Sequence, residues 1–363
     1  MTRALSDTQR RDWLRLCRTE NVGAVTFSQL IGRFGEAALA LAALPDLAQR
    51  GGRMARLKIP SEAEAEHELA AGAKLGARLI AACEPHFPAA LAALDPPPPL
   101  IWTRGNTSLL NRPSVAIVGA RVASAAGQRF ARGLASELGQ AGYLVTSGMA
   151  RGIDAAAHEG ALPTGTSAVL GGGVDDVYPP EHRALYDRIV ENGCVVSENE
   201  PGRTAVARDF PRRNRIIAGL SRAVVVVEAE LRSGSLITAR LAAEQGREVL
   251  AVPGSPLDPR ARGTNDLIRQ GAALCEGLDD VLRALETLPG LREPDQPSFQ
   301  DLPAAVDHDL IERLADLLSP TPVSRDEMVR AAQAPAPAVF AALMELALAG
   351  RAELRPGGMV VKG

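Results

Sequence analysis

The strongest constraint on the fold is an alternation of short apolar runs with helical stretches between residues 114 and 285. The runs are rich in valine and other apolar residues, which is typical of parallel strands buried on both faces. Crossover helices join such strands in βαβ units. The runs are Val115–Val118, Tyr143–Thr146, Ser167–Leu170, Cys194–Ser197, Val224–Val227 and Val249–Val252. The pattern predicts an α/β fold with a Rossmann-like parallel sheet as its core.

The ends of these runs carry the unusual residues of the chain. Glycine closely follows four of the runs, and a carboxylate, Glu198 or Glu228, follows the other two. The carboxyl ends of parallel strands meet at one edge of a sheet, where open α/β sheets bind their ligands. We therefore expect the working site at this edge.

Length and composition divide the chain into a core with flanking units. A chain of 363 residues is long enough for two or three domains. The prolines of residues 95–99 indicate a stiff boundary, and the proline-rich residues 286–306 indicate a linker. After the linker, three helical stretches precede a hairpin turn at Gly357-Gly358, which is the outline of a winged helix. The expected units are a small helical domain (1–83), the Rossmann-like core (84–285), the linker (286–306) and a winged-helix-like domain (307–363).

Several functions are disfavoured by what the sequence lacks. No Gly-Lys-Ser/Thr occurs, so the chain has no P-loop. Arg121 stands where a dinucleotide-binding turn needs its second glycine, which disfavours NAD. The four cysteines include no CxxC pair, so we expect neither a zinc site nor disulfides, and no cofactor. No apolar run approaches the length of a membrane span, and the expected location is the cytoplasm.

Three glycine turns follow successive strands and could bind an anion. In the first, Gly119 leads through Arg121 into a helix whose N-terminal N–H groups favour a phosphate. Arg121 adds a planar, permanently charged guanidinium group. The second turn carries Arg151 between two glycines, and the third begins with Gly171 and Gly172. Alternatively, Arg121 is an ordinary solvated loop residue.

The densest basic patch spans Arg203 to Arg215 and holds five arginines with one acid, Asp209. Such a cluster is often only a solvated face. This one leads directly into Ile216-Ile217 and the Val224–Val227 run, so its arginines are attached to a rigid element beside the ligand edge. The pattern favours a groove that follows a phosphate backbone.

Other polar residues near the edge have two readings. Asp154 and His158 are four residues apart on one helix and could form an acid–base pair, but a capping aspartate with a structural histidine is the alternative. Ser233 or Ser235 is expected to cap a helix, and Asn265 could either contact a ligand or cap the next helix.

The ordered segments VAIVGAR, SGMARGIDAAAH, AVLGGGVDDVYP, FPRRNRIIAGLS, VVVEA, SGSLITA and AVPG…GTNDLI resemble those of the DprA/Smf (DNA-processing protein A) family. The resemblance implies binding of single-stranded DNA during natural transformation, protection of that DNA, loading of the RecA recombinase, and a homodimer formed through the core. The segment Glu198-Asn199-Glu200-Pro201 departs from relatives, which more often have an aromatic residue between the glutamate and the proline, and His182 stands where relatives often carry asparagine.

Residues and resemblance together indicate a DNA site without catalytic or metal-binding residues. The family's Gly-Ser/Ala-Arg turn matches Gly119, Ala120 and Arg121, and its FPxRNR segment matches residues 210–215. Because aromatic residues make up only 3% of the chain, mainly phosphate contacts are expected. The residues expected to bind DNA or phosphate are Gly119, Ala120, Arg121, Ser124, Gly148, Arg151, Gly171, Gly172, Phe210, Arg212, Arg213, Asn214, Arg215, Ser233, Gly234 and Asn265.

Two other functions remain as alternatives. A nucleotide or nucleoside hydrolase would need a carboxylate facing a phosphate-binding turn, for which Glu228 and Asp154 are the candidates. A transcription regulator would read DNA with the third helix of the winged helix. The stretch Val339–Leu348 carries no lysine or arginine, so a structural or protein-binding role is expected for that domain instead.

Overall fold

The computed structural model describes residues 4–286 and 306–363, so residues 287–305 of the expected linker lie outside it. Its centre is a nine-stranded sheet with the order β1-β2-β6-β5-β4-β3-β7-β8-β9. The pairs from β6 to β9 in this order are all parallel, whereas β1 with β2 and β2 with β6 pair antiparallel. The strands are β1 (Ala77–Ala81), β2 (Leu100–Gly105), β3 (Ser114–Gly119), β4 (Leu144–Ser147), β5 (Thr166–Val169), β6 (Cys194–Ser197), β7 (Ala223–Val227), β8 (Glu248–Ala251) and β9 (Ala273–Leu274). The predicted Rossmann-like fold and its six strands are confirmed.

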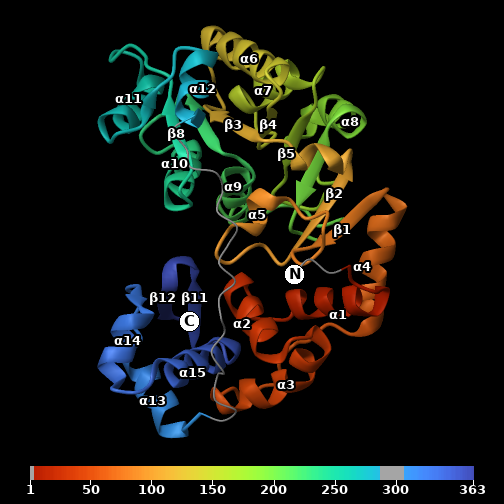
Figure 1. Cartoon of the computed structure of the whole chain (residues 1–363), viewed down its shortest axis with the longest axis vertical. Coiled ribbons are helices and arrows are strands. Elements are labelled where there is room, and N and C mark those ends of the chain that lie inside the picture. The colour runs from red at the N-terminus through yellow and green to blue at the C-terminus, as the bar shows by residue number, and fades with distance from the viewer. Residues whose placement is uncertain (1–3, 287–305) are drawn as a thin grey trace.

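Helices cover both faces of the sheet (Figure 1). Successive side chains of β3 alternate, so that Ala116 and Val118 pack with one helix layer and Val115 and Ile117 with the other. Burying each such aliphatic side chain stabilises the fold by about 1.5–3 kcal/mol. One layer contains α5 (Ala89–Ala92), α9 (Asp209–Leu220) and α10 (Gly234–Glu244), and the other contains α6 (Ala125–Gln140), α7 (Ile153–Ala161) and α12 (Leu278–Glu286). Two more helices, α8 (Arg183–Asn192) and α11 (Arg262–Arg269), lie towards the two sides of the sheet.

The N-terminal domain is a helical unit, as expected. Its helices are α1 (Asp7–Arg18), α2 (Ala24–Phe34), α3 (Ala37–Arg50) and α4 (Glu62–Lys74). Ser6 caps α1 by accepting from the Gln9 N–H at 3.2 Å, and the Gln9 side chain accepts from the Ser6 N–H at 3.0 Å. Helix α2 begins at Ala24, and Gly23 is its N-cap residue.

The boundary between this domain and the core differs from the expected one. Strand β1 lies within residues 1–83, yet it pairs with β2 along its whole length, so it belongs to the sheet. The prolines of residues 95–99 therefore lie within the core, between α5 and β2. Proline interrupts a helix, but it can directly precede a strand. Strands β1 and β2 were missed because they pair antiparallel and therefore lie outside the βαβ rhythm.

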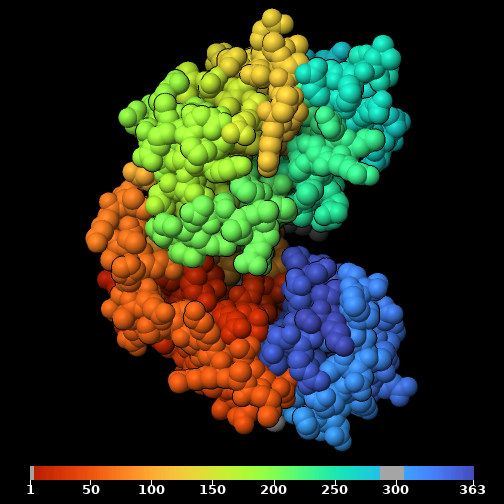
Figure 2. Space-filling model, turned by 180° about the vertical axis from the view of Figure 1, so that it is seen from behind, coloured from red at the N-terminus to blue at the C-terminus, as the bar shows by residue number. Residues whose placement is uncertain are grey.

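The winged-helix domain contains α13 (His308–Leu317), β10 (Val323–Ser324), α14 (Arg325–Ala332), α15 (Ala336–Leu348), β11 (Ala352–Arg355) and β12 (Met359–Lys362), with the expected turn at Gly357-Gly358. It packs against the N-terminal domain through α15. A hollow separates the winged helix from the sheet domain (Figure 2). No single helix in the described ranges is long and apolar enough to cross a membrane; only α14 and α15 together pass that test, and they are bent by 111°.

Candidate nucleic-acid interface

Two loops and the start of helix α9 bring a guanidinium and two aromatic rings together at the carboxyl edge of the sheet. Arg121 follows β3, Tyr178 follows β5, and Phe210 lies in the first turn of α9. The Arg121 guanidinium carbon is 5.8 Å from the centre of the Phe210 ring, and the Tyr178 and Phe210 ring centres are 5.3 Å apart. Arg121 is exposed and Tyr178 is 47% exposed, so this group, which we call the Arg121–Phe210 platform, is open to solvent.

The platform adds two aromatic rings to a site at which mainly phosphate contacts were expected. Aromatic residues are scarce in the whole chain, but two of them meet at the expected site. Tyr178 was missing from the predicted site residues. Its position directly after a glycine-rich strand end was the available signal, but its contact with Phe210 joins segments more than thirty residues apart and depends on the tertiary fold.

Helix α9 presents a second group of cations beside the platform. Arg208, Arg212 and Arg215 are spaced by four and three residues, so they share one helical face. Within the described parts of the chain, Arg208 and Arg212 are exposed and form no ion pair. Arg215 is partly buried and paired with Glu198. Arg208 and Arg212 therefore offer unpaired charge to a polyanion, and Arg215 completes the same face in a position that its ion pair with Glu198 fixes.

Arg213 does not have the position expected of a phosphate ligand. Its side chain points into the protein, where Nη1 donates to the Gly148 carbonyl at 2.7 Å and to the Val169 carbonyl. Burial lowers the pKa of Arg213 to about 10, an effect that nearby Asp154 opposes. The signal was present in the sequence: Arg213 precedes Ile216 and Ile217 by three and four residues, so helical periodicity places all three on the buried face.

The N-terminus of α6 is not a vacant anion site, contrary to expectation. The Glu228 carboxylate accepts from the Ser124 backbone N–H at 2.8 Å and from the Ser124 hydroxyl. A Cβ at Gly127, in the first turn of α6, would lie 2.7 Å from that carboxyl group. The chain's own carboxylate thus occupies the place where a Rossmann-like fold holds a phosphate.

Asp154 and His158 form no solvent-facing acid–base pair. The Asp154 carboxylate is buried and accepts from the Gly148 and Ala150 N–H groups at 3.1 and 3.3 Å. Burial raises its pKa. His158 is completely buried, and its Nδ1 lies 2.8 Å from Thr166 Oγ1. The structural alternative holds for both residues.

The remaining predicted contacts are engaged within the chain to different degrees. Arg151 is exposed but paired with Glu181. Gly172 is required by packing, because a Cβ there would lie 2.1 Å from Asp176 Oδ2. Ser233 caps α10 through the Ser235 N–H at 3.3 Å, and Asn265 bonds both the N–H and the carbonyl of Gly254, at 3.2 and 2.9 Å.

The other backbone and side-chain positions are packed to different degrees. A Cβ at Gly119 would lie 1.8 Å from the Val227 carbonyl oxygen, whereas one at Gly171 would lie at an ordinary contact distance, 3.4 Å, from the Phe210 ring. The Ala120 carbonyl accepts from the Ile153 N–H at 3.2 Å. Asn214 donates to the Gly234 carbonyl at 3.3 Å. These residues shape the edge of the sheet, and the exposed contacts come from the side chains around them.

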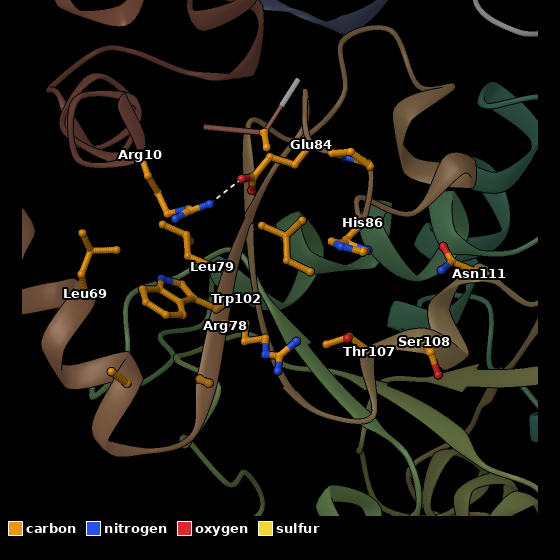
Figure 3. Close-up of a pocket in the computed structure, with 15 residues that line it drawn as sticks. Arg10, Leu69, Arg78, Leu79, Glu84, His86, Trp102, Thr107, Ser108 and Asn111 are labelled. Atoms are coloured by element: carbon orange, nitrogen blue, oxygen red, sulfur yellow. Dashed lines mark hydrogen bonds and ion pairs between the residues drawn. The ribbon is translucent and has the colours of Figure 1, made fainter. Parts of the chain in front are cut away.

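A cavity of about 630 Å³ lies elsewhere, along the outer edge of β1 (Figure 3). Arg10 and Glu84 form an ion pair of 2.5 Å in its wall, beside Leu79 and Trp102. None of its lining residues belongs to the platform or to α9. Within the described ranges, no group of three or more histidine, cysteine or acidic side chains could hold a metal ion.

The helix that a DNA-reading winged helix would insert into a groove is covered here. Met344 and Leu348 of α15 belong to the hydrophobic core of the N-terminal domain. Glu345 is completely buried and forms an ion pair of 3.1 Å with Arg50. Asn21 donates to the Leu348 carbonyl at 3.3 Å. In this arrangement α15 is an interdomain contact and is not available for reading duplex DNA.

Fold and edge together define a class: a Rossmann-like α/β protein with an arginine- and aromatic-lined edge, flanked by a small helical domain and a winged helix. Residues 78–286 match the family described as DNA recombination-mediator protein A. Residues 7–71 match the DprA-like N-terminal HHH domain, and residues 299–358 match the DprA winged helix domain. The chain belongs to this DprA/Smf family, as the sequence predicted.

Individual relatives agree with this assignment. Protein Smf of Escherichia coli is 41% identical over 291 residues, covering 78% of this chain and 76% of its own length. The crystal structure of DNA processing protein A from Streptococcus pneumoniae superposes with a TM-score of 0.62 at 35% identity, covering 75% of this chain and 95% of that one. The Helicobacter pylori protein, studied for its single-stranded DNA binding mode, gives a TM-score of 0.53 at 30% identity, covering 58% and 95%.

Proposed function

We propose that this chain binds single-stranded DNA along the Arg121–Phe210 platform and the exposed face of α9. The observation that carries the proposal is the meeting of an exposed guanidinium with two aromatic rings beside two unpaired arginines. Aromatic rings stack on unpaired bases, and arginines follow the phosphate backbone, so this combination suits a flexible single strand. The single-stranded DNA binding of the Helicobacter pylori relative supports the same function.

Internal contacts favour binding over hydrolysis. Glu228 is held by Ser124, and Asp154 is buried against backbone N–H groups, so neither carboxylate faces an open phosphate site. A hydrolase of the kind considered above needs such a carboxylate next to its substrate. We therefore propose a binding protein without enzymatic activity.

Replacing Arg121 or Arg212 with alanine is expected to weaken binding of a labelled oligothymidine strand. Each arginine that contacts one phosphate contributes about 0.7 to the slope of log affinity against log salt for a single strand. Each variant should lower the slope by about that amount, measured by fluorescence anisotropy across a salt series. Arg240→Ala is the matched control, because Arg240 is an exposed arginine on α10 whose partner is Glu244. Unchanged isotherms for both variants would remove the two arginines from the site.

The family resemblance extends the proposal to natural transformation, in which the bound strand is protected and passed to the RecA recombinase. The setting we propose is the cytoplasm, since buried thiols such as those of Cys194 and Cys275 suit a reducing compartment. A homodimer is also proposed. Exposed leucines near the β9 end of the sheet support it: Leu231, Leu257 and Leu274 are 58%, 90% and 43% exposed.

A Leu257→Asp, Leu274→Asp double variant is expected to be monomeric where the parent protein is a dimer. Two charges on an apolar contact surface must be desolvated when the surface is covered, which opposes association. Light scattering after size exclusion measures the mass directly. Leu317→Asp, on the 42% exposed Leu317 of the winged helix, is the control and should leave the mass unchanged. A parent protein with the mass of one chain would contradict the dimer.

A further inference from the structure

Arg18 reaches from the N-terminal domain into the sheet domain, next to the proposed DNA site. It ends α1, and its Nη1 donates to the carbonyl of Glu198, the residue that follows β6, at 3.0 Å. Its Nε lies 3.8 Å from the Glu200 carboxylate in the same loop. The Arg18 side chain is only 20% exposed. One side chain of the helical domain therefore holds the loop after β6.

The orientation of Arg18 is itself fixed by neighbouring groups. Glu68 on α4 accepts from Arg18 Nε and Nη2, at 3.1 and 2.9 Å. The same carboxylate accepts from Trp102 Nε1 on β2 at 3.0 Å, and Figure 3 shows the Trp102 ring beside α4. A guanidinium group bound by two parallel charge-assisted hydrogen bonds has a defined direction. Arg18 is thus preorganised towards the loop.

The loop connects Arg18 to the arginines of α9. The Glu198 side chain pairs with Arg215, while its backbone carbonyl is the group that Arg18 binds. Two residues on, Glu200 lies 3.8 Å from Arg203, which in turn pairs with Asp209 at 3.1 Å. Moving the Glu198 backbone would therefore move the carboxylate that sets the position of Arg215.

We propose that Arg18 is a positioning residue for DNA binding: by holding the Glu198 backbone, it lets Glu198 keep Arg215 aligned with Arg208 and Arg212. The inference rests on the proposed function of the α9 face. A binding group that is already in place loses less conformational freedom when the ligand arrives, so preorganisation increases affinity without a contact to the ligand. The N-terminal domain would then contribute to binding through the core.

The test measures oligothymidine binding of the full chain and its Arg18→Met and Arg18→Lys variants across a salt series. Both variants should bind roughly three- to tenfold more weakly, because methionine has no N–H donor and lysine lacks the planar fork that bonds Glu68 twice and the Glu198 carbonyl at once. The salt slope should stay that of the parent, because no phosphate contact is lost. Arg15→Met is the matched control, since the contacts that the Arg15 side chain makes in the described structure are to Pro60 and to acidic residues of its own domain. It should leave the affinity unchanged.

A double-mutant cycle separates positioning from general structural damage. In an Arg215→Ala background, Arg18→Met should cause no further loss of affinity, because the group that it positions is already gone. The proposal would be overturned if the affinity losses of the two substitutions multiplied in the double variant. It would also be overturned if Arg18→Met lowered the salt slope, or if that variant bound as tightly as the parent.

Hydrogen exchange tests the same contact without DNA. The Asn199 N–H donates to Ser197 Oγ at 3.0 Å and the Gly202 N–H donates to Asp175 at 2.8 Å, so both amides report on the loop. Arg18→Met should speed exchange at residues 199–203 and leave the centre of β3 unchanged. Unchanged exchange in the loop would overturn the role of Arg18. Failure of the parent protein to bind single-stranded DNA would instead overturn the proposed function.

Discussion

Arg213→Ala is expected to lower the free energy of unfolding by about 3–5 kcal/mol, as the loss of one partner from a buried charged network does. The substitution removes a donor shared by the Gly148 and Val169 carbonyls, which follow or end the neighbouring strands β4 and β5. It also leaves the buried Asp154 carboxylate without its cationic neighbour. Urea unfolding followed by circular dichroism measures the change.

Arg212 provides an internal control for this prediction. It is adjacent in sequence but exposed, and no carboxylate in the described chain pairs with it. Arg212→Ala should change stability by no more than about 0.5 kcal/mol, as is usual for a surface substitution, while weakening DNA binding. Two neighbouring arginines should therefore show opposite defects. Equal stability of the two variants would contradict the buried role of Arg213.

Acidification from pH 6.5 towards pH 3 is expected to destabilise the protein through His158. Thr166 Oγ1 donates its single proton to the Val145 carbonyl at 2.7 Å, so it accepts from His158 Nδ1–H. The other ring nitrogen, Nε2, is buried and has no hydrogen-bond partner among the residues that the structure describes. Burial, with His182 and Arg213 nearby, lowers the pKa of His158 to about 3. The folded protein therefore keeps this ring neutral.

The direction in which stability changes with pH follows from proton linkage. Below pH 6.5 the unfolded chain binds a proton at His158 and the folded chain does not until about pH 3, so stability is lost as the pH falls through this window. The loss can approach about 1.4 kcal/mol per pH unit. Urea unfolding between pH 7.5 and 5 should show it, because carboxylates titrate mostly below that range.

His158→Gln should flatten this pH dependence, since an amide does not titrate between pH 5 and 7.5. His86→Gln is the control, because His86 is exposed. It should keep the slope of the parent protein. A parent protein whose stability is constant between pH 7.5 and 5 would contradict the buried neutral histidine.

Much of the core could be predicted from the sequence because each strand is specified by a few consecutive residues. A run such as Val224–Val227 favours a strand, and its burial on both faces follows from valine at every position. The carboxyl edge follows from parallel pairing, so Arg121 and α9 were expected near each other, and the structure brings Arg121 to Phe210. Helical periodicity could also have separated Arg213 from Arg212.

Patterns within a few residues were thus enough to predict the six parallel strands, the presence of flanking domains and the edge where cations gather. Which groups at that edge are free depends instead on contacts between distant segments. Glu228 reaches Ser124 from more than a hundred residues away, Tyr178 meets Phe210, and Arg18 crosses from another domain to Glu198. Such contacts depend on where distant segments cross, and an unpaired charge looks the same in sequence as one neutralised by a remote partner.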